Sequence, residues 1–272
     1  MNISKETHSH MPDPGNLLDP KRPIVTLARD TSAPHYFPLH QHARAQLVYA
    51  SAGVLTVVTT QGTWVVPPQQ AVWVPAGIKH EVRSPGPVSM RSLYIHPAVT
   101  RGLPTYCCVV TITPLLRELI LEAVSLLNDY RPDGEESRLM YVILDKLQAL
   151  EPTPLHLPFP QDPRVKTVSD ALVANPADDR DLEVWADSAG ASSRTLARLF
   201  VKETGLTFGA WRQRLRLLAA ISRLGAGQPV TTVSYETGYH SPSAFIAMFK
   251  RTLGMPPGQS FRSPPIPPAV EG

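Results

Sequence analysis

The sequence lacks cysteine pairs, long hydrophobic runs and an apolar leader. Its only two cysteines, Cys107 and Cys108, are adjacent, so they cannot easily bridge each other and we expect buried, reduced thiols. No apolar run approaches the ~20 residues that a membrane span needs, and the first 20 residues are polar. We therefore expect a cytoplasmic protein without membrane contact. The 272 residues provide enough chain for about two domains.

Acidic residues are scarce between residues 194 and 262. Only Glu203 and Glu236 are acidic there, against ten lysines and arginines, whereas the whole chain has a net charge of +3. Positive charge that is this localised is typical of a surface that contacts phosphate, although a solvated basic helix face has the same composition. The helical pattern of this region favours double-stranded DNA as the partner.

The basic region contains an internal repeat. Leu196-x3-Phe200-x4-Gly205-Leu206 is repeated as Phe245-x3-Phe249-x4-Gly254-Met255, and a short helical segment with a glycine precedes each copy. This layout predicts two helix-turn-helix units. The first unit is expected to have helices over 182–188 and from Ser192 or Ser193 to 204, and the second over 231–237 and from Pro242. One continuous helix over 208–224 is expected to connect the two units.

The outward side chains of these helices predict how DNA is read. Arg194 and Arg198 are expected to read bases, because arginine bonds bidentately to guanine, and Lys202 to contact phosphate. The second unit offers small side chains, so we expect backbone positioning and contacts with thymine methyl groups. The arginines of the connecting helix either contact phosphates or form its solvated face. The predicted DNA-binding residues are Ser192, Ser193, Arg194, Thr195, Ala197, Arg198, Lys202, Arg212, Arg216, His240, Ser241, Pro242, Ser243, Ala247 and Lys250.

Residues 164–262 resemble the DNA-binding half of the AraC/XylS family of bacterial transcription regulators. The resemblance implies two helix-turn-helix units joined by a long helix. Ser234 departs from the family where alanine is more usual, and Ala247 departs where a longer side chain is common. The departure at Ala247 agrees with a second helix-turn-helix unit that contributes little to base recognition. The residues that carry the resemblance are Ser192 to Gly205, Gly238, Tyr239, Ser241, Phe245, Phe249, Gly254 to Pro257, Phe261 and Arg262.

Short strands separated by tight turns are predicted within residues 24–112. They cover 46–50, 54–60, 63–66, 71–74, 80–83 and 88–95, a pattern that favours a small barrel or sandwich. Two helices, over 113–130 and 135–150, are expected to follow, either as the interface of a homodimer or as a packing layer. Five prolines in 151–163 forbid helix and favour an extended, semi-rigid tether at the domain boundary. We expect residues 1–23 to be disordered and 263–272 to be flexible.

Three histidines in the strand region could form a site. Pro38 to His42 with Gln46, and Pro75 to His80, are similar to the two cupin motifs. Alternate side chains of a strand share a face, so His40 and His42 are expected to point the same way, with Gln46 on that face if the strand is unbroken and His80 closing the set from a facing strand. Metal-dependent cupins have glutamate where Gln46 stands, and a neutral amide is a poorer ligand.

Three interpretations of the histidines stay open. They bind a divalent metal through His40, His42 and His80, they bind a small effector without metal, or they lie at the rim of a purely structural barrel. Aromatic residues of neighbouring strands either wall the pocket or belong to the plain core. The candidate effector-binding residues are His40, His42, Gln46, His80, Tyr49, Trp64 and Trp73.

The predicted fold class is α+β with two domains. An N-terminal cupin-like β-barrel with a helical dimerisation segment precedes an all-α domain with two helix-turn-helix units. The resemblances imply a ligand-responsive, sequence-specific transcriptional regulator, which contacts RNA polymerase if it is an activator, and no enzyme. No cofactor is certain, and a divalent metal is the candidate.

Two other function classes compete with this interpretation. One is a metal-dependent cupin isomerase or dioxygenase with a fused helical domain, which Gln46 and the absence of an evident acid/base pair disfavour. The other is an interaction module whose helix-turn-helix units bind protein. Salt-dependent binding to duplex DNA distinguishes a regulator from the last class.

Overall fold

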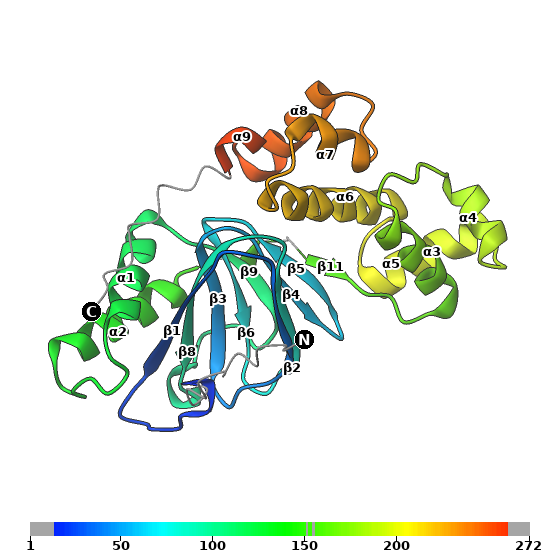
Figure 1. Ribbon diagram of the computed structural model, residues 1–272. Helices are drawn as coiled ribbons and strands as arrows, with labels where there is room; N and C mark the ends of the chain where they lie inside the picture. The colour runs from blue at the N-terminus through cyan, green and yellow to red at the C-terminus, as the bar shows by residue number, and fades with distance from the viewer. Residues whose placement is uncertain (1–13, 151, 154–155, 261–272) are drawn as a thin grey trace, which may run out of the picture.

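The computed structural model describes residues 14–150, 152–153 and 156–260, which build a strand-rich N-terminal half and a helical C-terminal half (Figure 1). The strands pair antiparallel in two sheets. The first sheet has the strand order β1-β8-β3-β6-β9-β10 and the second the order β11-β5-β4-β7-β2. The strands are β1 Ile24–Thr31, β2 His35–His40, β3 Ala45–Ala52, β4 Leu55–Thr59, β5 Gly62–Val66, β6 Gln70–Val74, β7 His80–Ser84, β8 Val88–Ile95, β9 Cys108–Thr111, β10 Pro152–Thr153 and β11 His156–Pro158.

The N-terminal half has three layers, because successive side chains of a strand point to opposite faces of its sheet. Val48 of β3 and Val57 of β4 belong to one buried core, so the two sheets pack face to face. Leu47 points to the other face of the first sheet, into a second core that the helices α1 (Pro114–Ser125) and α2 (Glu135–Gln148) complete. The helices therefore cover the first sheet on the side away from the second sheet (Figure 1).

All six strands that the sequence predicts are present, whereas β1, β2, β9, β10 and β11 are not predicted. The last two lie in the proline-rich segment 151–163, where β10 pairs with β9 and β11 with β5. Residues 152–153 and 156–158 are extended as predicted, but they pair with the two sheets and are no free tether, and Pro163 already begins a helix. Closure of the two sheets into one barrel stays a prediction.

The disorder predicted for residues 1–23 is wrong for residues 14–23. The buried guanidinium of Arg44 donates hydrogen bonds to the main-chain carbonyls of Leu17, Asp19 and Arg22, which fixes this segment on the start of β3. The backbone N–H of Arg44 also donates to the carbonyl of Gly15. Residues 1–13 and the predicted tail 263–272 lie outside the described residues.

Helix α1 ends at Ser125, five residues before the predicted end, because the following loop bonds to the edge strand β1. The side-chain oxygen of Asn128 accepts from the backbone N–H of Thr26 at 2.8 Å, and its amide donates to the carbonyl of Thr26 at 2.9 Å. The hydroxyl of Tyr130 donates to the carbonyl of Ile24 at 2.7 Å. The loop thus takes the place of a further strand at this edge.

The C-terminal half contains the two predicted helix-turn-helix units. Gly205 and Gly254 end the second helix of each unit in the left-handed conformation, with φ of 71° and 79°, which explains the glycine in each repeat. Helix α6 lies against β5 and β11 of the second sheet, so the two halves share one hydrophobic core. The helices are α3 Pro163–Ala174, α4 Leu182–Ser188, α5 Ser193–Thr204, α6 Phe208–Gly225, α7 Val230–Glu236, α8 Pro242–Leu253 and α9 Pro257–Ser260.

Candidate nucleic-acid interface and ligand pocket

The first helix-turn-helix unit is formed by α4 and α5 as the sequence predicts. Ser192 caps α5, since its hydroxyl accepts from the backbone N–H of Thr195 at 3.2 Å and donates to the hydroxyl of Thr195 at 2.9 Å. Leu196, Leu199 and Phe200 are buried against the rest of the domain. Ser192 and Thr195 therefore set the start of the helix.

The exposed face of α5 is basic. Arg194, Arg198 and Lys202 follow one another at intervals of four residues, so they form one stripe along the helix, and all three are exposed. In the part of the chain that the structure describes, no hydrogen bond or ion pair engages these three side chains. Ser193 and Ala197 are half-buried beside the stripe. The stripe is available to an anionic partner.

The second unit is formed by α7 and α8. The hydroxyl of Ser241 caps α8 by accepting from the backbone N–H of Ala244 at 3.2 Å, and Pro242 occupies the first helical turn. The inward set Phe245, Met248 and Phe249 is buried, as predicted. The predicted outward residues His240, Ser243, Ala247 and Lys250 are exposed, and Pro242 is half-buried.

A groove of about 350 Å³ lies between α6 and α8. One of its arginines, Arg251, is not among the predicted DNA-binding residues. Arg251 is exposed and lines this groove together with Arg212, Arg216 and Ala247. Because Arg251 is four residues after Ala247, helical spacing alone could have found it. The groove is rich in positive charge and adjoins the exposed face of α8.

The two predicted DNA-binding arginines of α6 make contacts inside the domain. Arg216 donates to the carbonyls of Pro176 at 2.9 Å, Asp178 at 3.0 Å and Gly238 at 3.2 Å, and burial lowers the pKa of its guanidinium. It therefore ties α6 to the loop before α4 and to the turn of the second unit. Arg212 donates to the carbonyl of Arg180 at 2.9 Å.

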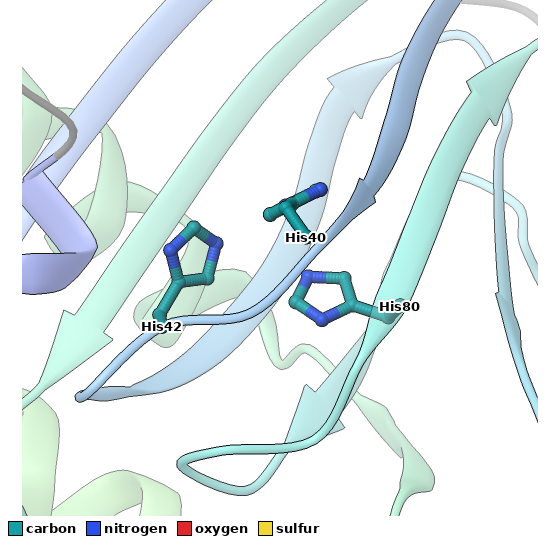
Figure 2. A group of neighbouring side chains, drawn as sticks. All are labelled: His40, His42 and His80. Carbon is teal, nitrogen blue, oxygen red and sulfur yellow. The ribbon is translucent and has the colours of Figure 1, made fainter.

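The three histidines lie together, as predicted. His40 ends β2, His42 lies in the loop before β3, and His80 begins β7 (Figure 2). One ring nitrogen from each can be chosen such that all three lie within 4.8 Å of one another. His42 and His80 are buried and His40 is half-buried, so the cluster is largely shielded from water.

Main-chain carbonyls fix two of the imidazole rings. Nδ1 of His80 lies 2.9 Å from the carbonyl oxygen of Ile78, and Nδ1 of His40 lies 2.6 Å from that of Pro38. A carbonyl oxygen only accepts, so each Nδ1 carries the proton. In a neutral His40 ring the lone pair therefore resides on Nε2.

Gln46 is the partner of His80. Its buried side-chain oxygen Oε1 lies 2.9 Å from Nε2 of His80, and its amide nitrogen donates to the hydroxyls of Ser92 at 3.3 Å and Tyr94 at 3.2 Å. An amide oxygen only accepts, so both ring nitrogens of His80 face accepting oxygens. Sequence reasoning misses Ser92 and Tyr94, although strand alternation on β8 puts both on the face of the first sheet that Gln46 occupies.

The predicted aromatic walls do not join this cluster. Tyr49 is three residues after Gln46 on β3, so it points to the opposite face of the first sheet, into the core beneath α1 and α2. Trp73 lies in the same core and donates to the carbonyl of Pro104 at 2.7 Å. Trp64 lies in the core between the sheets, where its ring stacks on His156.

A cavity of about 890 Å³ adjoins the histidines. It lies at β1 and β2, the edge strands of the two sheets, and at the loop that follows α1. Its wall is mostly apolar, with a few polar groups of the kind that fix the orientation of a small ligand. The residues that line it include Leu27, Phe37, His40, His42, Tyr94, Val124, Leu126 and Asn128.

Comparisons with known proteins agree with this architecture. Residues 22–144 match the AraC-like ligand binding domain family and residues 185–263 match a helix-turn-helix domain family. The chain is similar to the HTH-type transcriptional regulator NimR of Escherichia coli K12, with 39% identity over 222 residues that cover 82% of this chain and 81% of NimR. It is also similar to the HTH-type transcriptional regulator RipA of Corynebacterium glutamicum, with 37% identity over 39% of this chain and 31% of RipA.

Among solved structures, ToxT from Vibrio cholerae aligns with 88% of this chain and 97% of the ToxT chain, with a TM-score of 0.37 and 12% identity.

In the described ranges of our chain, no helix is long and apolar enough to cross a membrane.

Proposed function

The chain belongs to the AraC family of DNA-binding transcriptional regulators, and we propose that a small effector in the cavity beside the histidines controls how it binds a specific operator. The observation that carries the DNA-binding part is the unpaired basic stripe on α5. The cavity between the edge strands carries the effector part. The protein acts in the cytoplasm, contacts RNA polymerase if it activates, and catalyses no reaction of its own.

The first helix-turn-helix unit supplies most of the sequence discrimination in this proposal. Arg194 and Arg198 read bases in the major groove and Lys202 contacts a phosphate, because all three are exposed and have no partner among the described side chains. The second unit meets the next major groove, where Ser243 and Ala247 offer only short side chains. Its contribution is positioning and apolar contact with thymine methyl groups.

Selection of sequences from a random duplex pool tests the DNA-binding part. The full chain is expected to enrich one motif, with an affinity that falls steeply as salt rises. Arg198→Ala should relax the preference at one or two base pairs, at a cost of about 1–3 kcal/mol, while Ser243→Ala should leave the motif intact. The opposite result, with Arg198→Ala neutral and Ser243→Ala destructive, would reverse the assignment of the two units.

The cavity is proposed as the effector pocket because it reaches both the histidines and the loop after α1. The loop carries Leu126 and Asn128, which line the cavity, and Asn128 also bonds to β1. An occupant that displaces this loop therefore acts on α1 and α2. Thermal-shift screening tests this: compounds that stabilise the wild type should fail to stabilise Leu27→Trp, which fills the cavity. Equal stabilisation of both proteins would locate the pocket elsewhere.

The helices α1 and α2 are proposed as the interface of a homodimer. Leu115 of α1 and Tyr141 of α2 are 56% and 52% exposed, so both large apolar side chains are available to a second subunit. A dimer predicts paired or repeated operator half-sites. Sedimentation equilibrium should give twice the monomer mass for the wild type and the monomer mass for Tyr141→Lys. A wild type that sediments as a monomer would assign the helices to packing alone.

The three histidines keep one enzyme alternative worth testing, namely a metal-dependent isomerase or dioxygenase built on the sandwich. It predicts turnover that requires a tightly held ion. Gln46 argues against this alternative, because a neutral amide faces Nε2 of His80 where metal-dependent cupins have glutamate.

A further inference from the structure

We infer that His40, His42 and His80 form a labile site for a divalent first-row transition metal ion, and that Gln46 competes with the ion for Nε2 of His80. The inference rests on the proposed function, since it names an ion as the effector or as the anchor of one. Imidazole nitrogens suit zinc, nickel, copper and iron, and three of them within 4.8 Å form a facial set that an ion can bridge by small side-chain shifts.

The hydrogen bonds of the rings support a ligand role more strongly than proximity does. Histidines that bind a metal almost always donate their other ring N–H to a carboxylate, a carbonyl or water, which fixes the tautomer and aims the lone pair. His40 and His80 both do this, through the carbonyls of Pro38 and Ile78 at 2.6 and 2.9 Å. Nε2 of His40 is therefore directed to coordinate, whereas Nε2 of His80 first has to give up its contact with Oε1 of Gln46.

The cavity beside the histidines offers the ion a path of entry and leaves coordination positions open. His40 and His42 line the cavity of about 890 Å³ between the edge strands, so an ion can enter there and keep coordination positions for water or an organic ligand. Figure 2 shows the three rings grouped together, with His42 on a loop and His80 on β7. This differs from a closed structural site, in which protein ligands fill all positions.

Gln46 sets the strength of the site. Its amide already bonds to Nε2 of His80, and an ion that binds there must break this contact. The amide is also neutral, so no negative charge at this position offsets the charge of the ion. Both effects weaken binding, which makes the site suited to sensing a varying concentration.

When an ion displaces Gln46 from His80, hydrogen bonds within the first sheet change. Gln46 also bonds to Ser92 and to Tyr94 of β8, and Tyr94 lines the cavity. Strand β8 pairs with β1, the strand that the loop after α1 holds through Asn128. Metal at the histidines therefore changes the hydrogen bonds that lead to the proposed dimerisation helices.

Titration with Co²⁺ tests the inference on the full, tag-free chain after treatment with chelator. We expect one ion per chain and visible d–d absorption bands, displaced by Zn²⁺. His80→Gln and His40→Gln should each weaken binding about tenfold or more. The controls are His240→Gln, on an exposed residue of the helical half, and a variant in which His8 and His10 are both replaced by Gln, because those histidines could bind ions by themselves.

Gln46→Glu is the decisive variant, because misfolding cannot strengthen a site. It should bind Co²⁺ about tenfold more tightly or better, since a carboxylate ligand replaces the competing amide. The inference is overturned if no ion binds, if binding survives in both triad variants, or if it is lost with His8 and His10. An unchanged affinity of Gln46→Glu overturns the role of Gln46.

The same preparations separate this inference from the proposed function. Operator binding measured on each sample, with and without ion, reports on the regulator independently. A protein that binds its operator but no ion refutes the metal site and leaves the regulator in place. A protein that binds the ion through the triad but prefers no DNA sequence refutes the regulator instead.

Discussion

Substitution of Arg216 separates two roles that the sequence leaves open for the arginines of α6. In one role Arg216 contacts a phosphate of the DNA. In the other, which the structure favours, it holds the helical domain together through the carbonyls of Pro176, Asp178 and Gly238. Arg216→Met removes the donors and keeps a helix-forming side chain of similar length.

The expected loss of stability follows from these three hydrogen bonds. Bonds to a charged group contribute about 1.5–3 kcal/mol each when buried, and Arg216 is half-buried, so we take about 1 kcal/mol for each bond. The free energy of unfolding of the helical domain should therefore fall by about 3 kcal/mol, which is about a 100-fold change in the unfolding equilibrium. The guanidinium lies 2.7 Å from where a Cβ of Gly238 would stand, so it packs directly on this part of the backbone.

Urea unfolding followed by circular dichroism measures this loss, and the salt dependence of operator binding measures the second role. A phosphate contact contributes about 0.9 to the slope of log affinity against log salt concentration. Arg216→Met should keep the wild-type slope, while the matched Arg198→Met or Lys202→Met should change affinity or slope without loss of stability. If Arg216→Met unfolds like the wild type and its slope decreases by about one, Arg216 contacts phosphate and the reasoning fails.

Three further predictions concern other parts of the chain. Burial raises the pKa of Cys107 to about 12, so a thiol reagent at pH 8 should modify it only after unfolding, and rapid labelling of the folded protein would contradict its burial. Burial lowers the pKa of His156, so its contribution to the free energy of unfolding should be full above about pH 6.5 and should fall as the pH drops below that value. Denaturant titrations of His156→Gln should lack this fall. Gly225→Val should open the contact between the halves, because a Cβ at this position would lie 2.3 Å from a methyl group of Val54. Limited proteolysis within 151–163 should then be faster. An unchanged rate would show that this contact does not hold the halves together.

The helical half is predictable from sequence because its determinants are local. Ser192 and Ser241 cap helices, and Gly205 and Gly254 end them, within the same segments that they define. The bounds of α4 accordingly agree with prediction to the residue, and α5 begins after the cap Ser192, one of the two predicted caps, and ends at Thr204. The hydrogen-bond partners of Arg216 are not predictable in this way, because its three acceptors come from loops that only the tertiary fold brings to α6.

The strand-rich half is predictable only in part, because pairing between distant segments decides it. The histidine cluster follows from the motif, but the expectation of one unbroken strand from His40 to Gln46 is wrong, because His40 ends β2, His42 lies in a loop and Gln46 belongs to β3 of the other sheet. Alternation on β3 does exclude Tyr49 from the site, since Gln46 and Tyr49 differ by an odd number of positions. The unpredicted β11 shows the other limit. His156 to Pro158 carry no strand pattern of their own and become a strand because β5 offers an open edge.

The same three residues decide how a signal can pass from the sandwich to the DNA-binding half. The carbonyl of Pro158 accepts from the indole N–H of Trp211 at 3.0 Å, and the carbonyl of His156 accepts from Arg214 at 3.3 Å. Strand β11 is therefore shared, hydrogen-bonded on one side to β5 and on the other to α6. A flexible tether would let an effector act only by changing the local concentration of the two halves. A shared strand connects the second sheet directly to α6, the helix between the two helix-turn-helix units, and this connection supports the proposal that an effector controls DNA binding through the orientation of the helical half.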